Sequence, residues 1–166
     1  MNHVLPTLIL LAVAVALTAC GRDEPPPAQG PATEAAAAAA AALQSLRKPA
    51  PPDATVYFIS PAHGDRVTSP VTVIFGLKGM GVAPAGIDKP DTGHHHLLVD
   101  TQLSNPNIPL PKDDQHLHFG DGQTQVKLEL APGSHQLQLV LGDHLHIPHE
   151  PPVLSEAITI EVVAGE

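Results

Sequence analysis

Cysteine, tryptophan and basic residues are scarce in this 166-residue chain, and each shortage narrows the range of functions. The single cysteine has no partner for a disulfide within the chain and no companion for a paired thiolate metal site. Tryptophan is absent and aromatic residues make up only 2% of the chain, which leaves no aromatic platform for sugar rings. Only 8 Lys and Arg oppose 17 Asp and Glu, and the net charge of −9 argues against nucleic acid as a partner.

The first 19 residues have the length and apolar character of a secretory signal peptide and end in small side chains. They are fewer than the roughly 20 consecutive apolar residues that a membrane-spanning helix needs. The run Leu17-Thr18-Ala19-Cys20 resembles a bacterial lipobox, in which the cysteine is acylated, as with palmitate, and becomes the new N-terminus. We therefore predict a lipoprotein with a signal peptide at 1–19 and lipidation at Cys20.

A lipid on Cys20 implies a position in the cell envelope, on the periplasmic side of a membrane. The residue after the cysteine is Gly21 and not Asp. In enteric-type lipoprotein sorting this resembles the pattern of lipoproteins delivered to the outer membrane. The acidic balance offers no attraction to anionic lipid headgroups, so the lipid itself would hold the protein at the membrane. An envelope protein partner is a second expectation, without a residue that identifies it.

Residues 20–52, called the tether below, are rich in proline and alanine and contain little that could form a core. Thr33 can cap a helix with its body at 35–42, with Arg47 and Lys48 in its last turn and Pro49 ending it. We expect a partly helical spacer, although a disordered spacer of this composition would serve equally well.

Residues 53–166 show short alternating runs of apolar and polar residues, separated by proline and glycine. Such runs are typical of an all-β domain in which each strand buries one face. We predict a single immunoglobulin-like antiparallel β-sandwich of about seven strands. The predicted strands are 55–59, 71–77, 94–100, 116–119, 123–130, 134–141 and 156–163.

Histidine is abundant, with 11 residues in the chain, and most of them fall in three groups near Gly93, Gly120 and Gly142. Residues i and i+2 of a strand point to the same face, so each His-x-His pair can direct two imidazoles to one point. Imidazole suits divalent ions such as Cu(II) and Zn(II). Asp100 and Asp143 could accept a hydrogen bond from the far ring nitrogen of a ligand. The predicted ligands are His94, His96, His118, His146 and His149.

Two other roles for the histidines remain open. The rings can hydrogen-bond loop carbonyls and carboxylates in a structural or protein-interaction module without metal, or they can charge together as the pH falls. His95 and His135 share strand faces with leucines, which favours a structural place for both. No nucleophile elbow, zinc-protease motif or phosphate-binding loop is present, so we do not expect an enzyme.

Four segments together resemble an uncharacterised bacterial domain family of exported or lipid-anchored proteins. They are GHHHLL at 93–98, HFGDGQT at 118–124, PGSHQLQL at 132–139 and GDHLHIPHEPPVLS at 142–155. His63, His116 and His144 lie outside the matching positions. The resemblance implies membership of a family of unknown function and assigns no activity.

Overall fold

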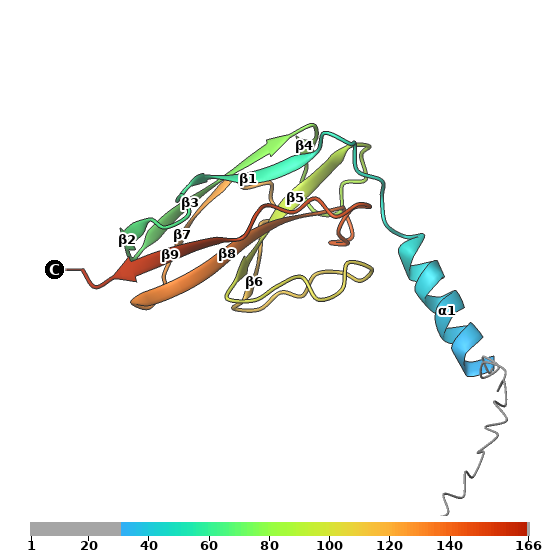
Figure 1. Cartoon of the computed structure of the whole chain (residues 1–166). Helices are drawn as coiled ribbons and strands as arrows, with labels where there is room; N and C mark the ends of the chain where they lie inside the picture. The colour runs from blue at the N-terminus through green and yellow to red at the C-terminus, as the bar shows by residue number, and fades with distance from the viewer. Residues whose placement is uncertain (1–30, 166) are drawn as a thin grey trace, which may run out of the picture.

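A computed structural model of the chain describes residues 31–165 and consists mostly of β-strands with one helix (Figure 1). The helix α1 (Pro31–Gln44) extends away from the sheets, and its run of alanines explains its formation, because alanine has the highest helix propensity. It ends at Gln44, so the prediction that Arg47 and Lys48 occupy its last turn is wrong. No helix in the described part of the chain is long and apolar enough to cross a membrane.

The smaller sheet is antiparallel and has three strands in the order β1 (Thr55–Ser60), β3 (Val71–Lys78) and β7 (Gln125–Leu128). Alternation along β3 buries Val71, Val73 and Phe75 and leaves Thr72 exposed. One face of this sheet is therefore apolar, as the sequence pattern predicts.

The larger sheet has six strands in the order β2-β9-β8-β5-β4, with β6 also paired to β5. Its long central strands are β5 (Thr92–Val99) and β8 (Gly133–Gly142), which pair antiparallel. The shorter members are β2 (Arg66–Thr68), β4 (Gly81–Val82), β6 (His116–His118) and β9 (Ile158–Val163). The sheet is mixed, because β2 runs parallel to β9 and β4 runs parallel to β5.

The main core lies between the two sheets. Val73 and Phe75 of the smaller sheet pack in one cluster with Leu97, Leu139 and Ile160 of the larger sheet. The opposite face of the larger sheet carries a second, smaller cluster of Leu98, Leu110 and Val140. The connection 101–115 supplies Leu110, so this loop covers part of the outer face of the larger sheet.

All seven predicted strands are present, but two features of the predicted fold are corrected. The structure adds β2 and β4, and both make parallel pairs, so the architecture is a curled mixed sheet plus a small antiparallel sheet rather than a purely antiparallel sandwich. Strands β2 and β4 bury no side chain fully, so their residues do not show the apolar and polar alternation that predicts a strand. The predicted signal peptide and Cys20 lie outside the described residues.

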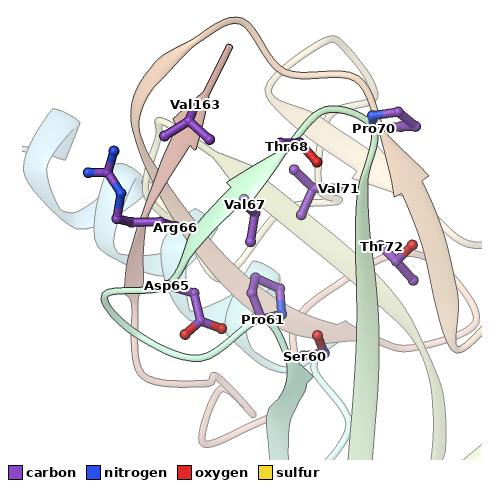
Figure 2. Close-up of a pocket in the computed structure, with 10 residues that line it drawn as sticks. All are labelled: Ser60, Pro61, Asp65, Arg66, Val67, Thr68, Pro70, Val71, Thr72 and Val163. Carbon is purple, nitrogen blue, oxygen red and sulfur yellow. The ribbon is translucent and has the colours of Figure 1, made fainter. Parts of the chain in front are cut away.

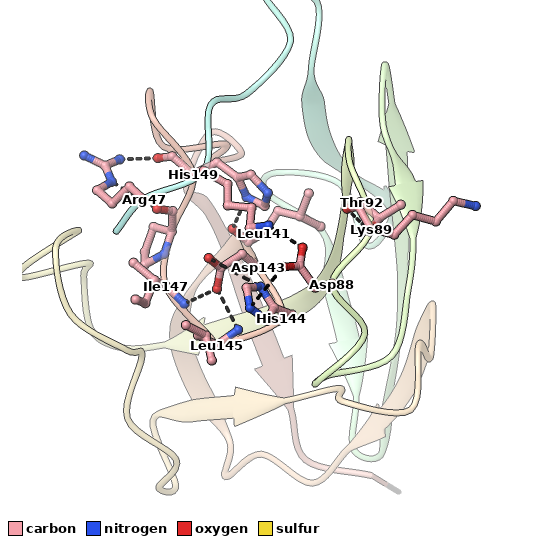
Figure 3. Close-up of polar contacts among 12 residues, drawn as sticks. Arg47, Asp88, Lys89, Thr92, Leu141, Asp143, His144, Leu145, Ile147 and His149 are labelled. Atoms are coloured by element: carbon pink, nitrogen blue, oxygen red, sulfur yellow. Dashed lines mark hydrogen bonds and ion pairs between the residues drawn. The ribbon is translucent and has the colours of Figure 1, made fainter. Parts of the chain in front are cut away.

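The end of the tether binds the domain directly. Arg47 has a side chain only 4% exposed, and its guanidinium donates hydrogen bonds to the carbonyl of Pro148 and the carboxylate of Glu150. It also donates to the carbonyl of His149 (Figure 3). Backbone hydrogen bonds join Ala50 and Lys48 to Glu150. The last residues of the tether are therefore fixed to the loop that follows β8.

Candidate metal centre

Strand β5 divides its three consecutive histidines between two faces. His95 points into the main core, where its ring lies 5.2 Å from that of Phe75. This position agrees with the face that His95 shares with Leu97 and Val99 in the sequence pattern. His94 and His96 point to the outer face with Leu98, and both are buried at 1% exposure or less. Two imidazoles thus lie beneath the loops that cover the larger sheet.

The neighbours of β5 complete the surroundings of these two rings. His118 on β6 is the register partner of His96, so their side chains share one face. On the other side, Gly142 of β8 is the register partner of His94. Because glycine has no side chain, the space above Gly142 stays open for the histidine rings.

A tight turn after β8 supplies a fourth imidazole, that of His146. The Asp143 carboxylate accepts hydrogen bonds from the backbone N–H groups of Leu145 at 2.8 Å and Ile147 at 2.9 Å (Figure 3). His146 itself has a φ of +68°, a left-handed conformation that is unusual for a residue other than glycine. Its carbonyl accepts a hydrogen bond from Leu110, which links the turn to the covering loop.

The rings of His94, His96, His118 and His146, called the four-histidine cluster below, lie close together. Their centroid separations run from 4.7 Å for His118 and His146 to 5.9 Å for His96 and His146. One ring nitrogen from each of His94, His96 and His118 lies within 4.8 Å of the others, so these three residues can hold a metal ion. The Nε2 atoms of His94 and His96 are 3.1 Å apart.

Several buried nitrogens of this cluster lack a hydrogen-bond partner. They are Nδ1 of His94, Nδ1 of His96 and Nε2 of His118. An unpartnered buried polar atom is costly, and native proteins contain few of them. His95 in the main core also lacks a partner at both ring nitrogens, so it is the grouping of several rings, and not the missing hydrogen bonds by themselves, that marks this place as a ligand site.

Two glycines make room for the rings. A Cβ atom on Gly120 would lie 2.3 Å from Cε1 of His118, and one on Gly142 would lie 2.9 Å from Nε2 of His96. Neither glycine has a positive φ, so steric space, and not backbone conformation, explains the residue type. The glycines in the histidine-containing segments therefore shape the cluster.

The environment keeps the buried imidazoles neutral. Burial, followed by the charges of His146 and His118, lowers the pKa of His94 to about 4. Burial and the charge of His94 likewise lower the pKa of His96 to about 2. Neutral imidazole is the form that binds metal, so both rings are ready to coordinate an ion near neutral pH.

A cavity of about 250 Å³ adjoins the cluster and is lined by His96, His118 and His146 together with Leu110, Pro111 and Lys112. A larger cavity of about 430 Å³ lies between the β1–β2 connection, β2 and the start of β3, and no histidine lines it (Figure 2). Size alone therefore does not locate the site. The histidine chemistry favours the smaller cavity.

Three other predicted site residues lie outside the cluster. His149 is buried, with Nδ1 3.4 Å from the Leu141 carbonyl oxygen. Asp143 accepts hydrogen bonds from backbone N–H groups of its own turn and from none of the four histidine rings of the cluster. Asp100 accepts hydrogen bonds from His135 and from the backbone N–H of Gln136, at the far end of β5.

The remaining histidines have structural contacts. His63 accepts a hydrogen bond from the Thr159 N–H, and His116 lies 2.8 Å from an oxygen of Asp113. His135 has an acceptor at each ring nitrogen, with Asp100 at 2.7 Å and the Ala131 carbonyl at 2.9 Å. His144 faces Asp88 at 3.7 Å. The partners of these four histidines are all residues outside the four-histidine cluster.

Sequence reasoning missed Leu110 and Lys112 as part of the site surroundings. Both lie in the long proline-containing connection 101–115, and the signal that the sequence offers for them is this length, because long connections are often functional.

The sequence of the domain matches one family model, described as a domain of unknown function (DUF4399), over residues 73–163. This chain belongs to the DUF4399 family. The matched region contains all four histidines of the cluster and the turn that carries His146. The expectation of a family of unknown function is confirmed at this level.

Other comparisons add little to the DUF4399 assignment. No curated protein matches the chain. A solved structure, the endo-beta-1,4-mannanase from Thermotoga petrophila, is similar over 68% of this chain and 20% of that chain, with 20% identity and a TM-score of 0.40. The DUF4399 protein thus corresponds to about a fifth of the enzyme, and a similarity this weak supports no conclusion about fold or activity.

Proposed function

We propose that this protein binds a divalent metal ion, Cu(II) or Zn(II), through His94, His96 and His118, with His146 as the fourth ligand. The observation that carries the proposal is that one ring nitrogen from each of His94, His96 and His118 lies within 4.8 Å of the others, beside the ring of His146. An ion placed among these rings would accept one nitrogen lone pair from each histidine.

The donor set favours borderline ions. Imidazole nitrogens suit Zn and Cu(II), whereas Mg and Ca prefer oxygen ligands and Cu(I) prefers sulfur. Among residues 31–165, the group identified as able to hold an ion contains three histidines and neither cysteine nor carboxylate. Histidine as the only ligand type is therefore central to the proposed selectivity.

We also propose that the protein acts by binding and not by catalysis, from a lipid anchor at Cys20 on the periplasmic side of the outer membrane. The lipobox-like run and the tether support this position. Metabolic labelling with a palmitate analogue tests it: the wild-type chain should be labelled, and a Cys20→Ala variant should not. Label on the variant, or none on the wild type, would refute the anchor.

An immunoglobulin-like fold remains part of the proposal. It is supported by the division of the first strands between the sheets, since β1 pairs with β3 in one sheet and β2 pairs with β9 in the other. The shared core between the sheets is a second supporting feature.

Isothermal titration of the purified full-length protein with Cu²⁺ and with Zn²⁺ tests metal binding. We expect one ion per chain with micromolar or tighter affinity, and a loss of at least about tenfold in a His118→Ala variant, because one of the ligands is removed. The matched control is His116→Ala on the same strand, since His116 contacts Asp113 outside the cluster.

Absence of binding, or equal binding by the wild type and the His118→Ala variant, would contradict the proposal. The alternative structural module predicts that His118→Ala lowers stability equally with and without metal. Melting curves recorded with and without chelator therefore separate the two functions.

A further inference from the structure

The proposed metal centre has an unbalanced charge. Four neutral imidazoles leave a divalent ion with its full charge of +2, and the metal-ligating group identified within residues 31–165 includes no carboxylate. Oδ1 of Asp143 accepts hydrogen bonds from the backbone N–H groups of Leu145 and Ile147, while its Oδ2 is buried without a hydrogen-bond partner, and Asp143 is not part of the ligating group. An uncompensated charge in a buried site is unfavourable, so an anion from solution would stabilise the centre.

The cavity beside the cluster gives such an anion a path and a binding place. Its volume of about 250 Å³ is several times the share of about 30 Å³ that one water takes in the liquid. It remains smaller than the pockets of about 300 to 1,000 Å³ that hold drug-sized ligands. The size therefore fits a short organic ion rather than a single hydroxide or a large substrate.

The lining of the cavity indicates the chemistry of the ligand. Lys112 is an exposed cation that lines the cavity together with His118. Leu110 is 8% exposed and offers an apolar wall. One cation, one metal position and one apolar wall together match a small anion with a short hydrocarbon end.

We propose that the solvent-facing position of the bound metal takes a small monocarboxylate of the acetate to isobutyrate class. One carboxylate oxygen coordinates the ion, the other lies beside the Lys112 ammonium, and the alkyl group contacts Leu110. This inference rests on the proposed metal site and names the ligand class of that site.

The test uses full-length protein loaded with Cu²⁺, with its metal content measured by elemental analysis before each titration. Acetate, propionate and isobutyrate are added while the visible absorption of the copper is recorded. We expect a saturable shift with a dissociation constant on the order of 1 mM, and tighter binding of propionate than of acetate. Acetamide, which has the same shape without the charge, should produce no shift.

A Lys112→Met variant should keep its metal content and bind acetate about tenfold more weakly, because the second carboxylate oxygen loses a charged partner. Lys78→Met is the matched control, since Lys78 is exposed on β3 and does not line this cavity. Its acetate affinity should stay within about twofold of the wild type.

Failure of this inference differs from failure of the metal proposal. A copper-loaded protein that shows no carboxylate-dependent shift, or the same shift with chloride and no preference for a longer alkyl chain, overturns the inference alone. Unchanged acetate affinity in Lys112→Met overturns the role of Lys112 and with it the proposed pose. Protein without bound copper overturns both proposals.

Discussion

At the residue scale, the absence of a single carbon atom at Gly120 determines where the His118 ring can lie. Since a Cβ there would be 2.3 Å from the ring, we predict that Gly120→Ala displaces His118 and lowers metal affinity by about tenfold or more. The backbone tolerates alanine at this position, so the fold should remain. Titration calorimetry gives the affinity, and circular dichroism reports the fold.

Gly81→Ala is the control for this substitution, because its Cβ would meet its nearest atom at an ordinary 3.4 Å. Its metal affinity should match that of the wild type. Wild-type affinity in Gly120→Ala would instead place His118 outside the ligand set.

A second prediction at the residue scale concerns the pH dependence of stability. Burial alone would lower the pKa of His135, but hydrogen bonds to the Asp100 carboxylate and the Ala131 carbonyl outweigh it and raise the pKa. Hydrogen-bond acceptors at both ring nitrogens favour the charged imidazolium form of His135. The stability that this form contributes to the fold is fully present below about pH 6.5, and it is lost as the pH rises through the raised pKa of His135.

Asp100→Asn retains a carbonyl oxygen for Gln136 and removes the charge. We expect it to lower the free energy of unfolding by about 1 kcal/mol near pH 5.5 and by less near pH 9. Urea unfolding at the two pH values measures the difference. A deficit that is constant or grows with pH would show that His135 is not charged in the fold.

At the scale of elements, the end of the tether is fastened to the loop that follows the His146 turn. We predict that Arg47→Ala lowers the free energy of unfolding by about 1 to 3 kcal/mol, because two carbonyls and the Glu150 carboxylate lose a buried charged donor. Lys48→Ala should cost less than about 1 kcal/mol, since its contact with Asp88 is partly exposed. Denaturant unfolding of both variants tests the contrast, and equal losses would contradict it.

Elements also differ in how far the sequence predicts them. Alternation of apolar and polar residues identifies β3 and β9, which bury one side of an extended strand, whereas β5 and the end of β8 are buried on both faces. It cannot identify β2 and β4, whose parallel pairing depends on distant strands. The convergence of His94, His96 and His118 follows from strand alternation plus register. The position of His146 depends on a turn organised by Asp143. The positions of His149 and Asp100 depend on packing in a loop and at a strand end, which the spacing of residues along the sequence does not predict.

At the scale of the whole molecule, metal binding should appear as added stability. An ion that binds only the folded state at 100 times its dissociation constant contributes about 2.7 kcal/mol. We predict that Zn²⁺ raises the melting temperature by several degrees and that chelator reverses the rise. A His118→Ala, His146→Ala double variant should lose the response, whereas His63→Ala should retain it. Thermal scans monitored by circular dichroism test this, and a response that persists in the double variant would contradict it.

The central claim is that the four-histidine cluster holds the ion. X-ray absorption spectroscopy of the Zn²⁺-loaded protein tests it most directly, because it reports the atoms bound to the metal. The account predicts three or four nitrogen ligands at about 2.0 to 2.1 Å with the multiple scattering of imidazole rings. A shell of oxygen atoms with one imidazole or none would contradict it.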